Sequence, residues 1–161
     1  MSDIWNKVYA HDTSFFGDDP SNFGLECYKE FEKHGAKKIL ELGCGQDRDT
    51  IFFAFNDIDV IAIDSSQIAI DVLSQTPKQK NLSIKAMVYN ANEDIPFDNS
   101  YFDAVYSHMF FNMRFTDAQL KYLFVEVNRV LKNGGLNCFP SEATMMQCTK
   151  RVRKSKKIFT T

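Results

Sequence analysis

The segment Ile39-Leu40-Glu41-Leu42-Gly43-Cys44-Gly45-Gln46 joins an apolar run to an acidic residue and a Gly-x-Gly turn. Small residues in such a turn let the backbone approach a bound nucleotide-like ligand closely. The free N–H groups at the start of a following helix attract an anion such as a carboxylate. Because similar turns join many strands to helices, the segment taken alone also fits a simple tight turn.

Asp64 closes the next apolar run and follows the glycine turn by about 20 residues, a spacing at which a carboxylate can accept two hydrogen bonds from ribose hydroxyls. The alternative is an ordinary helix N-cap beside Ser65. A nicotinamide dinucleotide fingerprint would need a third glycine at position 48, where this chain has Arg48. The pattern therefore favours a different adenosyl compound over NAD.

Strand-like and helix-like segments alternate along the chain after an N-terminal helix, which predicts a parallel sheet covered by helices. The helix that begins at Pro20-Ser21 carries apolar residues at helical spacing, and His34-Gly35 can end it. Thr116 and Gln119 resemble a capping box at the start of a later helix, which Asn133-Gly134-Gly135 ends. The predicted strands span residues 37–42, 58–63, 82–88, 102–107 and 136–139.

Four segments in order resemble class I S-adenosylmethionine (SAM)-dependent methyltransferases: ILELGCGQDRDT, Asp64 after the second strand, NANEDIPFDNSYFDAVYS and EVNRVLKNGG. The N-terminal WNKVY and FFGDDPSNFG further resemble the small-molecule methyltransferases of the tellurite-resistance type. The resemblance covers roughly residues 4–139. It implies an α/β fold, a Rossmann-like three-layer sandwich with a mostly parallel sheet, and SAM-dependent methyl transfer to a small molecule.

The resemblance also implies roles for individual residues on the cofactor. Gly43 and Gly45 would pass beneath the methionine part of SAM, and Glu41 would hold the loop or contact the amino group. Asp64 would bind the ribose, and Ser65 or Ser66 would lie near the adenine. The full set of implied cofactor-binding residues is Glu41, Gly43, Cys44, Gly45, Asp64, Ser65, Asn90, Ala91 and His108.

Asn90 falls where an acidic or amide side chain meets the adenine amino group, with Ala91 beside it. His108 would lie near the transferable methyl group, and a histidine without a role fits the sequence equally well. No catalytic residue is assigned, because methyl transfer needs an acid or base only for substrates that must lose a proton. No metal site is expected, because the histidines and cysteines are scattered.

Two features at the edges of the implied site leave alternatives open. Asp47 stands where the family commonly has a third glycine; it tolerates a left-handed backbone but places a negative charge near the ligand carboxylate. A group of N-terminal aromatic residues can form a lid over the cofactor, although packing into the core is favoured. These residues are Trp5, Tyr9, Phe15 and Phe16.

The end of the chain departs from the family, whose sheet order is 3-2-1-4-5-7-6. Residues 140–161 contain no convincing strand pair, so we expect the order 3-2-1-4-5 with the final pair missing. The unpaired edge of strand five would be covered by the tail, by a dimer partner or by a neighbouring chain. The predicted organisation is one domain over residues 1–142 and a basic tail over 143–161. A truncated domain that binds SAM without turnover is the second functional hypothesis.

Charge and composition bound the remaining possibilities. The chain has 161 residues and a net charge of −2, although residues 150–157, KRVRKSKK, hold six basic residues. The acidic body is a poor nucleic-acid surface, so a nucleic-acid module built on the tail is the third hypothesis. The absence of a membrane-length apolar run and of an apolar leader predicts a soluble, cytoplasmic protein. The four cysteines, none of them in a CxxC pair, are expected to be reduced thiols.

Overall fold

The computed structural model describes residues 2–12, 17–75, 81–140 and 147–151. Its strands are β1 (Lys38–Leu42), β2 (Asp59–Asp64), β3 (Ile84–Val88), β4 (Phe102–Tyr106), β5 (Leu131–Phe139) and β6 (Gln147–Lys150). Its helices are α1 (Ser2–His11), α2 (Asn22–His34), α3 (Arg48–Phe55), α4 (Gln67–Gln75), α5 (Asp117–Val130) and the short 3-10 helix η2 (Phe110–Asn112).

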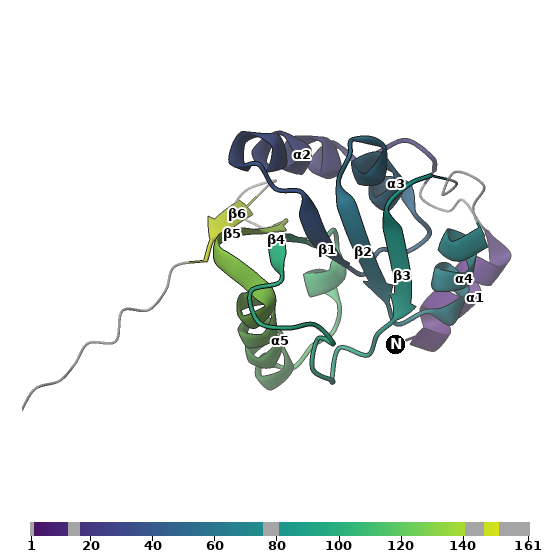
Figure 1. The fold of residues 1–161 in the computed structure, drawn as a ribbon. Helices are drawn as coiled ribbons and strands as arrows, with labels where there is room; N and C mark the ends of the chain where they lie inside the picture. Colours follow the sequence, from purple (N-terminus) through teal and green to yellow (C-terminus); the bar gives the residue numbers. More distant parts are fainter. Residues whose placement is uncertain (1, 13–16, 76–80, 141–146, 152–161) are drawn as a thin grey trace, which may run out of the picture.

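The strands form one sheet in the order β3-β2-β1-β4-β5-β6. Figure 1 shows the strands of this sheet as arrows. The pairs among the first five strands are parallel, and β6 runs antiparallel to β5. The predicted order of the first five strands is therefore confirmed. Parallel pairing requires long crossover connections, and helices supply most of them here.

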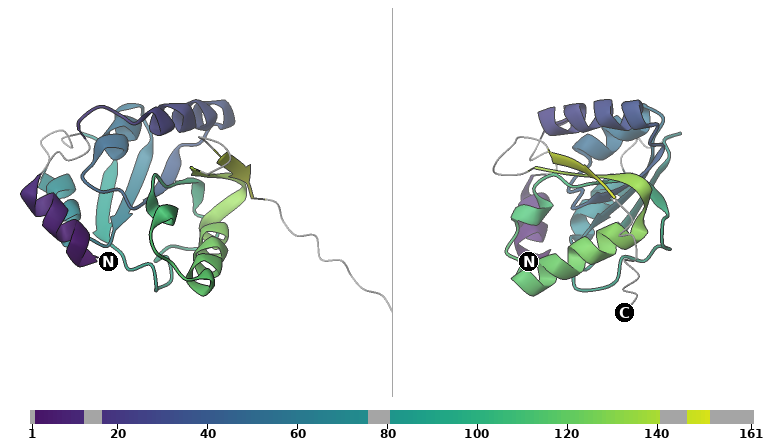
Figure 2. Two further views of the ribbon diagram at one scale, coloured as in Figure 1. Left: turned by 180° about the vertical axis from the view of Figure 1, so that it is seen from behind. Right: turned by 90° about the vertical axis from the view of Figure 1, so that its left-hand side faces the viewer.

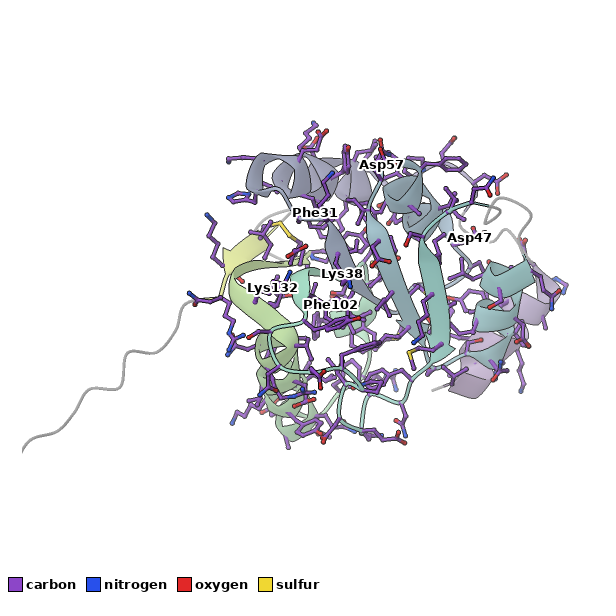
Figure 3. All side chains as sticks on the ribbon, viewed as in Figure 1. Phe31, Lys38, Asp47, Asp57, Phe102 and Lys132 are labelled. Atoms are coloured by element: carbon purple, nitrogen blue, oxygen red, sulfur yellow. A yellow bond between two sulfur atoms is a disulfide. The ribbon has the colours of Figure 1, made fainter. Side chains whose placement is uncertain are left out.

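Helices cover both faces of the sheet, as the three views of Figures 1 and 2 show. One face packs against α2, α3 and α4, with Phe31 at the centre of that core. The other face packs against α5 and the loop before β4, with Phe102 at its centre. Figure 3 shows Phe31 and Phe102 on opposite sides of the sheet. Since Ile39 and Leu40 enter different cores, β1 is buried on both faces, as a central parallel strand should be.

The predicted helix boundaries of α2 and the start of α5 are confirmed at atomic detail. Ser21 is the N-cap of α2 and accepts a hydrogen bond from the Gly24 N–H, while Gly35 ends the helix at φ 65°. Thr116 and Gln119 form the capping box of α5. These caps satisfy helix-end groups that would otherwise lack partners.

The end of α5 differs from the prediction. The helix stops at Val130, and β5 begins at Leu131 with no loop between them. Residues 133–135, predicted to end the helix, lie inside β5, where Gly134 has φ 80°. The glycines there accommodate the register shift between β4 and β5 rather than a helix cap.

The edge of β5 is covered by the chain's own tail, which is one of the three alternatives that the sequence leaves open. The sheet therefore continues one strand beyond the predicted five, because β6 pairs antiparallel with β5. This strand comes from the segment 143–161 that the sequence identifies as a basic tail. The register places Cys138 directly opposite Cys148, with the Cα atoms 4.2 Å apart, and the two form a disulfide. The prediction of four reduced thiols is therefore wrong for this pair, while Cys27 and Cys44 are free and buried.

None of the helices in the described part of the chain has the length and apolarity needed to cross a membrane.

Candidate functional site

A cavity of about 590 Å³ lies at the carboxyl ends of the parallel strands. Ligands of open α/β sheets bind at this edge, where the connections diverge, and the volume falls in the usual range for a small-molecule pocket. All nine residues of the cofactor-binding set that the resemblance implies line this cavity. These residues are Glu41, Gly43, Cys44, Gly45, Asp64, Ser65, Asn90, Ala91 and His108.

The glycine turn after β1 has no room for side chains. Gly43 has φ 70°, and a Cβ atom placed on it would lie 2.9 Å from Cδ2 of Phe110. Gly45 has φ 56°, and a Cβ there would lie 3.0 Å from the Tyr9 hydroxyl. Both positions require a left-handed backbone and a bare surface, so the turn presents main-chain atoms to the cavity.

Glu41, at the end of β1, supports the glycine turn through a hydrogen bond to α3. Its carboxylate accepts a 2.6 Å hydrogen bond from Thr50 Oγ1 on α3, and its side chain is buried. Burial raises the pKa of Glu41 well above its ordinary value, and the negative charge of Asp49 adds to the effect. Glu41 therefore ties β1 to α3 behind the turn, which is one of the two roles that the family resemblance implies for it.

Asp64 holds the turn from the side. One carboxylate oxygen accepts the Gly45 N–H at 3.0 Å, and the other accepts the Ser66 N–H at 2.8 Å. Burial raises the pKa of Asp64, although these backbone N–H groups oppose the rise. A carboxylate has about four acceptor sites, so the two bonds leave capacity for a ligand's hydroxyl groups.

The adenine-side residues lie at the ends of β2 and β3. Ser66 caps α4 through a bond from the Ala69 N–H and also donates to Asn6 of α1, which leaves the exposed Ser65 at the cavity. Asn90 accepts the Asn92 N–H in its own turn at 3.1 Å. Its side chain therefore shapes the loop as well as lining the cavity.

Asp47 carries the strained backbone of the site. It precedes α3 as N-cap with φ 125° and makes no side-chain capping bond. This angle lies outside the left-handed well that aspartate tolerates, so the residue occupies a conformation natural to glycine. The sequence expectation of a surviving turn holds, but at a cost in strain.

The sequence left two roles open for the N-terminal aromatic residues, a lid over the cofactor and packing into the core. Tyr9 is only 4% exposed and packs beside Gly45, and Trp5 stacks on it with ring centroids 5.4 Å apart. Burial is the main cause that raises the pKa of the Tyr9 hydroxyl. Both residues line the cavity. Phe15 and Phe16 lie outside the described residues.

His108 follows β4, the strand next to β1, and lies beside a buried carboxylate that was not predicted from the sequence. Its Nδ1 lies 3.5 Å from Asp49 Oδ2, and Asp49 also accepts hydrogen bonds from Ser21 and Tyr106. Asp49 is 5% exposed. No local pattern predicts this group, because Ser21 and Asp49 are separated by 28 positions in the sequence.

The remaining residues that follow β4 and line the cavity are mostly apolar, and they were not predicted from the sequence. The apolar ones are Met109, Phe110, Met113 and Phe115. Gln119 of α5 closes this side by donating from Nε2 to Asn92 Oδ1 at 2.7 Å. The available signal was the run of large apolar residues just after the fourth strand.

Comparison with known proteins places this geometry in a family. The model of a family described as "Methyltransferase domain" matches residues 39–135, more than half of the chain. An uncharacterized methyltransferase of Synechocystis is 31% identical over 100 residues, covering 62% of this chain and 44% of that protein. A probable S-adenosyl-L-methionine-dependent methyltransferase, TehB of Haemophilus influenzae, is 34% identical over 55 residues, covering 34% of this chain and 19% of that protein.

Solved structures share the fold. The structure of Haemophilus influenzae TehB matches with a TM-score of 0.61 and 22% identity, covering 71% of this chain and 39% of that one. A putative sarcosine dimethylglycine methyltransferase from Galdieria sulphuraria matches with a TM-score of 0.68 and 17% identity, over 84% of this chain and 58% of that one. The chain spans less than half the length of the curated relatives it matches. With the glycine turn, the acid after β2 and the family match in agreement, the chain belongs to the methyltransferase-domain family.

Proposed function

We propose that this protein binds SAM in the cavity at the ends of β1 and β2 and transfers its methyl group to a small molecule. The observation that carries the proposal is the pairing of the bare turn at Gly43 and Gly45 with the Asp64 carboxylate, which lies within hydrogen-bond distance of that turn. The relatives' printed names support the same cofactor. A cytoplasmic location belongs to the proposal, as the sequence predicts.

The residues of the cavity fit the proposed cofactor. The turn backbone and the start of α3 suit the methionine part, because exposed N–H groups there attract its carboxylate. Asp64 has acceptor capacity left for ribose hydroxyls, and Ser65, Asn90 and Ala91 form the wall for the adenine. When bound, SAM supplies an electrophilic methyl group on a sulfonium sulfur. The chain contributes orientation and the exclusion of water by Trp5, Phe110 and Phe115.

Calorimetric titration of SAM into the protein and into Asp64→Ala tests the proposal. Hydrogen bonds to a charged group contribute about 1.5–3 kcal/mol each, so losing the ribose contacts should weaken SAM binding by at least about tenfold. Asp71→Ala is the matched control, because Asp71 is an exposed carboxylate on α4 that accepts only a bond from Gln67 among those described. Its affinity for SAM should equal that of the wild type.

Two results would overturn the proposal. One is a wild-type protein that gives neither heat nor a thermal shift with SAM or S-adenosylhomocysteine. The other is Asp64→Ala binding SAM as tightly as the wild type does. Because Asp64 also holds the turn, Asp64→Asn serves as a second variant that keeps the side-chain volume and one acceptor oxygen; it should bind SAM with intermediate affinity.

No observation on the described residues favours the truncated inactive domain or the nucleic-acid module. Of the basic run 150–157, only Lys150 and Arg151 lie within the described residues.

A further inference from the structure

His108, which follows β4, and Asp49, in the first turn of α3, form a couple beside the cavity. His108 follows β4 and lines the cavity, with its side chain 27% exposed. Asp49 lies behind it in the first turn of α3, where its own side chain is almost fully buried. The Nδ1 of His108 faces Asp49 Oδ2 at 3.5 Å. The geometry therefore directs one ring nitrogen to a carboxylate and leaves the other, Nε2, for a ligand.

Asp49 is held in place by two elements, the N-terminal end of α2 and β4. Its Oδ1 accepts the Ser21 N–H at 2.7 Å, and its Oδ2 accepts the hydroxyls of Ser21 at 2.8 Å and of Tyr106 at 2.5 Å. Gly24 leaves the space that the carboxylate occupies, because a Cβ on Gly24 would lie 2.7 Å from Oδ1. These contacts tie the start of α3 to the N-cap of α2 and to β4, and they fix the position of the carboxylate.

The Asp49 carboxylate is ionised despite its burial. Burial opposes ionisation, but hydrogen bonds from His108, Tyr106 and Ser21 outweigh it and lower the pKa of Asp49. Two groups lie 3.5 Å from Nδ1: the Asp49 carboxylate, which can accept a proton from it, and the Arg48 guanidinium, which can only donate one to it. Pairing with the ionised Asp49 corresponds to the tautomer that carries its proton on Nδ1. The lone pair of Nε2 is then available to accept a proton from a molecule in the cavity.

Arg48 is the second charged group that faces His108. Its Nη2 lies 3.5 Å from His108 Nδ1, and its Nε lies 4.0 Å from Asp49 Oδ1. A guanidinium there repels a cationic amine and attracts an anion as it forms. The nearest ring is Phe23, whose centroid is 5.3 Å from the imidazole. The charges therefore favour an acceptor that is neutral before reaction and becomes an anion when it loses a proton.

We propose that His108, positioned by Asp49, is the general base that deprotonates the methyl acceptor, and that the acceptor is an aromatic molecule with an O–H or S–H group. This inference rests on the proposed function. The aromatic part follows from the wall formed by Phe110, Met113 and Phe115, which offers apolar and sulfur–aromatic contacts.

The proposed step balances without a further reactant. The acceptor oxygen or sulfur forms a bond to the methyl carbon while the carbon–sulfonium bond breaks and its electron pair passes to the sulfur. The acceptor proton moves to Nε2 of His108, which later releases it to water. The products are a methyl ether or thioether and S-adenosylhomocysteine.

The test compares two phenols as probes in the full-length protein. Phenols such as 4-methylphenol resemble tyrosine, with an O–H pKa of about 10, whereas 4-nitrophenol is already largely ionised at a pH of about 8. His108→Gln should lower kcat/KM for 4-methylphenol by about 100-fold and leave that for 4-nitrophenol nearly unchanged.

Asp49→Asn tests the positioning role. It should lower kcat/KM for 4-methylphenol by at least about tenfold, because an amide does not hold the Nδ1–H tautomer as a carboxylate does. It should leave kcat/KM for 4-nitrophenol nearly unchanged, because a phenol that is already ionised needs no base. If Asp49→Asn does not fold, His108→Gln alone still decides the question, because the His108 side chain is partly exposed.

The failures of the two proposals are distinguishable. Equal losses for both phenols in His108→Gln would overturn the base and leave only a packing role. Failure of the wild type to methylate any phenol or aryl thiol, while it binds SAM, would overturn the acceptor class and leave the cofactor proposal intact. Failure of the wild type to bind SAM would overturn both.

Discussion

The two walls of the cavity are built in different ways. The wall after β1 and β2 consists of a contiguous turn and one acid at the next strand end, so Gly43, Gly45 and Asp64 meet through two neighbouring parallel strands. The wall after β4 is assembled from distant segments, because His108 depends on Asp49, which depends on Ser21 and Tyr106. The residues of the wall after β1 and β2 can therefore be identified from short stretches of sequence. The residues of the wall after β4 come together only when the chain folds.

The largest effect is expected at Gly43, because Phe110 from the wall after β4 lies directly against this residue of the glycine turn. Gly43→Ala adds a Cβ at positive φ against the Phe110 ring, which should cost about 2–3 kcal/mol of stability and weaken SAM binding by at least about tenfold. Urea unfolding and calorimetry measure the two effects.

Gly35→Ala is the matched control for this change. Gly35 has a similar φ of 65°, but a Cβ there meets nothing within 4 Å, and the residue lies outside the cavity. It should cost about 1 kcal/mol of backbone strain and leave SAM affinity unchanged. Equal SAM affinities in the two variants would mean that Gly43 does not approach the ligand.

Asp47 tests whether the wall after β1 and β2 can be improved. Asp47→Gly relieves a backbone at φ 125° and removes a negative charge near the expected carboxylate. It should raise stability by about 1 kcal/mol, a thermal shift of about 3 °C, and tighten SAM binding severalfold.

Asp57→Gly is the control for Asp47→Gly, because it makes the same substitution where the backbone is less strained. Asp57 follows α3 with φ 59°, within the well that aspartate tolerates, and Figure 3 shows both aspartates on the molecule. Its replacement should change stability by less than about 0.5 kcal/mol. A larger gain from Asp57→Gly than from Asp47→Gly would contradict the assignment of strain to Asp47.

The smallest expected effects are pH-dependent and opposite in sign on the two sides of the sheet. Burial raises the pKa of Glu41, so the folded state holds its proton more tightly than the unfolded state, and this residue's contribution to stability falls as the pH rises above about 4.3. The stability difference between the wild type and Glu41→Gln should therefore shift in favour of Glu41→Gln as the pH rises from about 4.5 to about 7.5.

Glu126 on α5 gives the matched contrast. Its hydrogen bond from Arg129 lowers the pKa of Glu126, so its contribution is present above the ordinary glutamate pKa and is lost as the pH falls through the lowered value. Glu126→Gln should therefore lose stability relative to the wild type only as the pH rises toward about 4.5, and the difference should stay constant between about 4.5 and about 7.5, where that for Glu41→Gln still changes. Urea midpoints of the three proteins below, at and above a pH of about 4.5 provide the measurement, and a Glu126→Gln deficit that keeps growing above that pH would refute the assignment.

The features that the sequence predicts depend on short-range patterns, and the features that it misses depend on contacts between distant segments. The order of five strands and the capping box at Thr116 depend on short-range patterns, and both are confirmed. The Asp49 group was missed because its partners lie on α2 and β4, and β6 was missed because four residues carry no alternating pattern. The disulfide followed from the missed strand, since only the register of β6 brings Cys148 opposite Cys138.

The pairing of β6 with β5 also decides how a second copy could add to the sheet. An identical molecule that approaches this side meets β6, only four residues long, followed by Arg151. Short edge strands with cations are poor templates for further strands, because two such edges repel each other before their main chains can bond. A homodimer through the edge of the fifth strand, one of the alternatives that the sequence leaves open, would have to form across this charged edge instead.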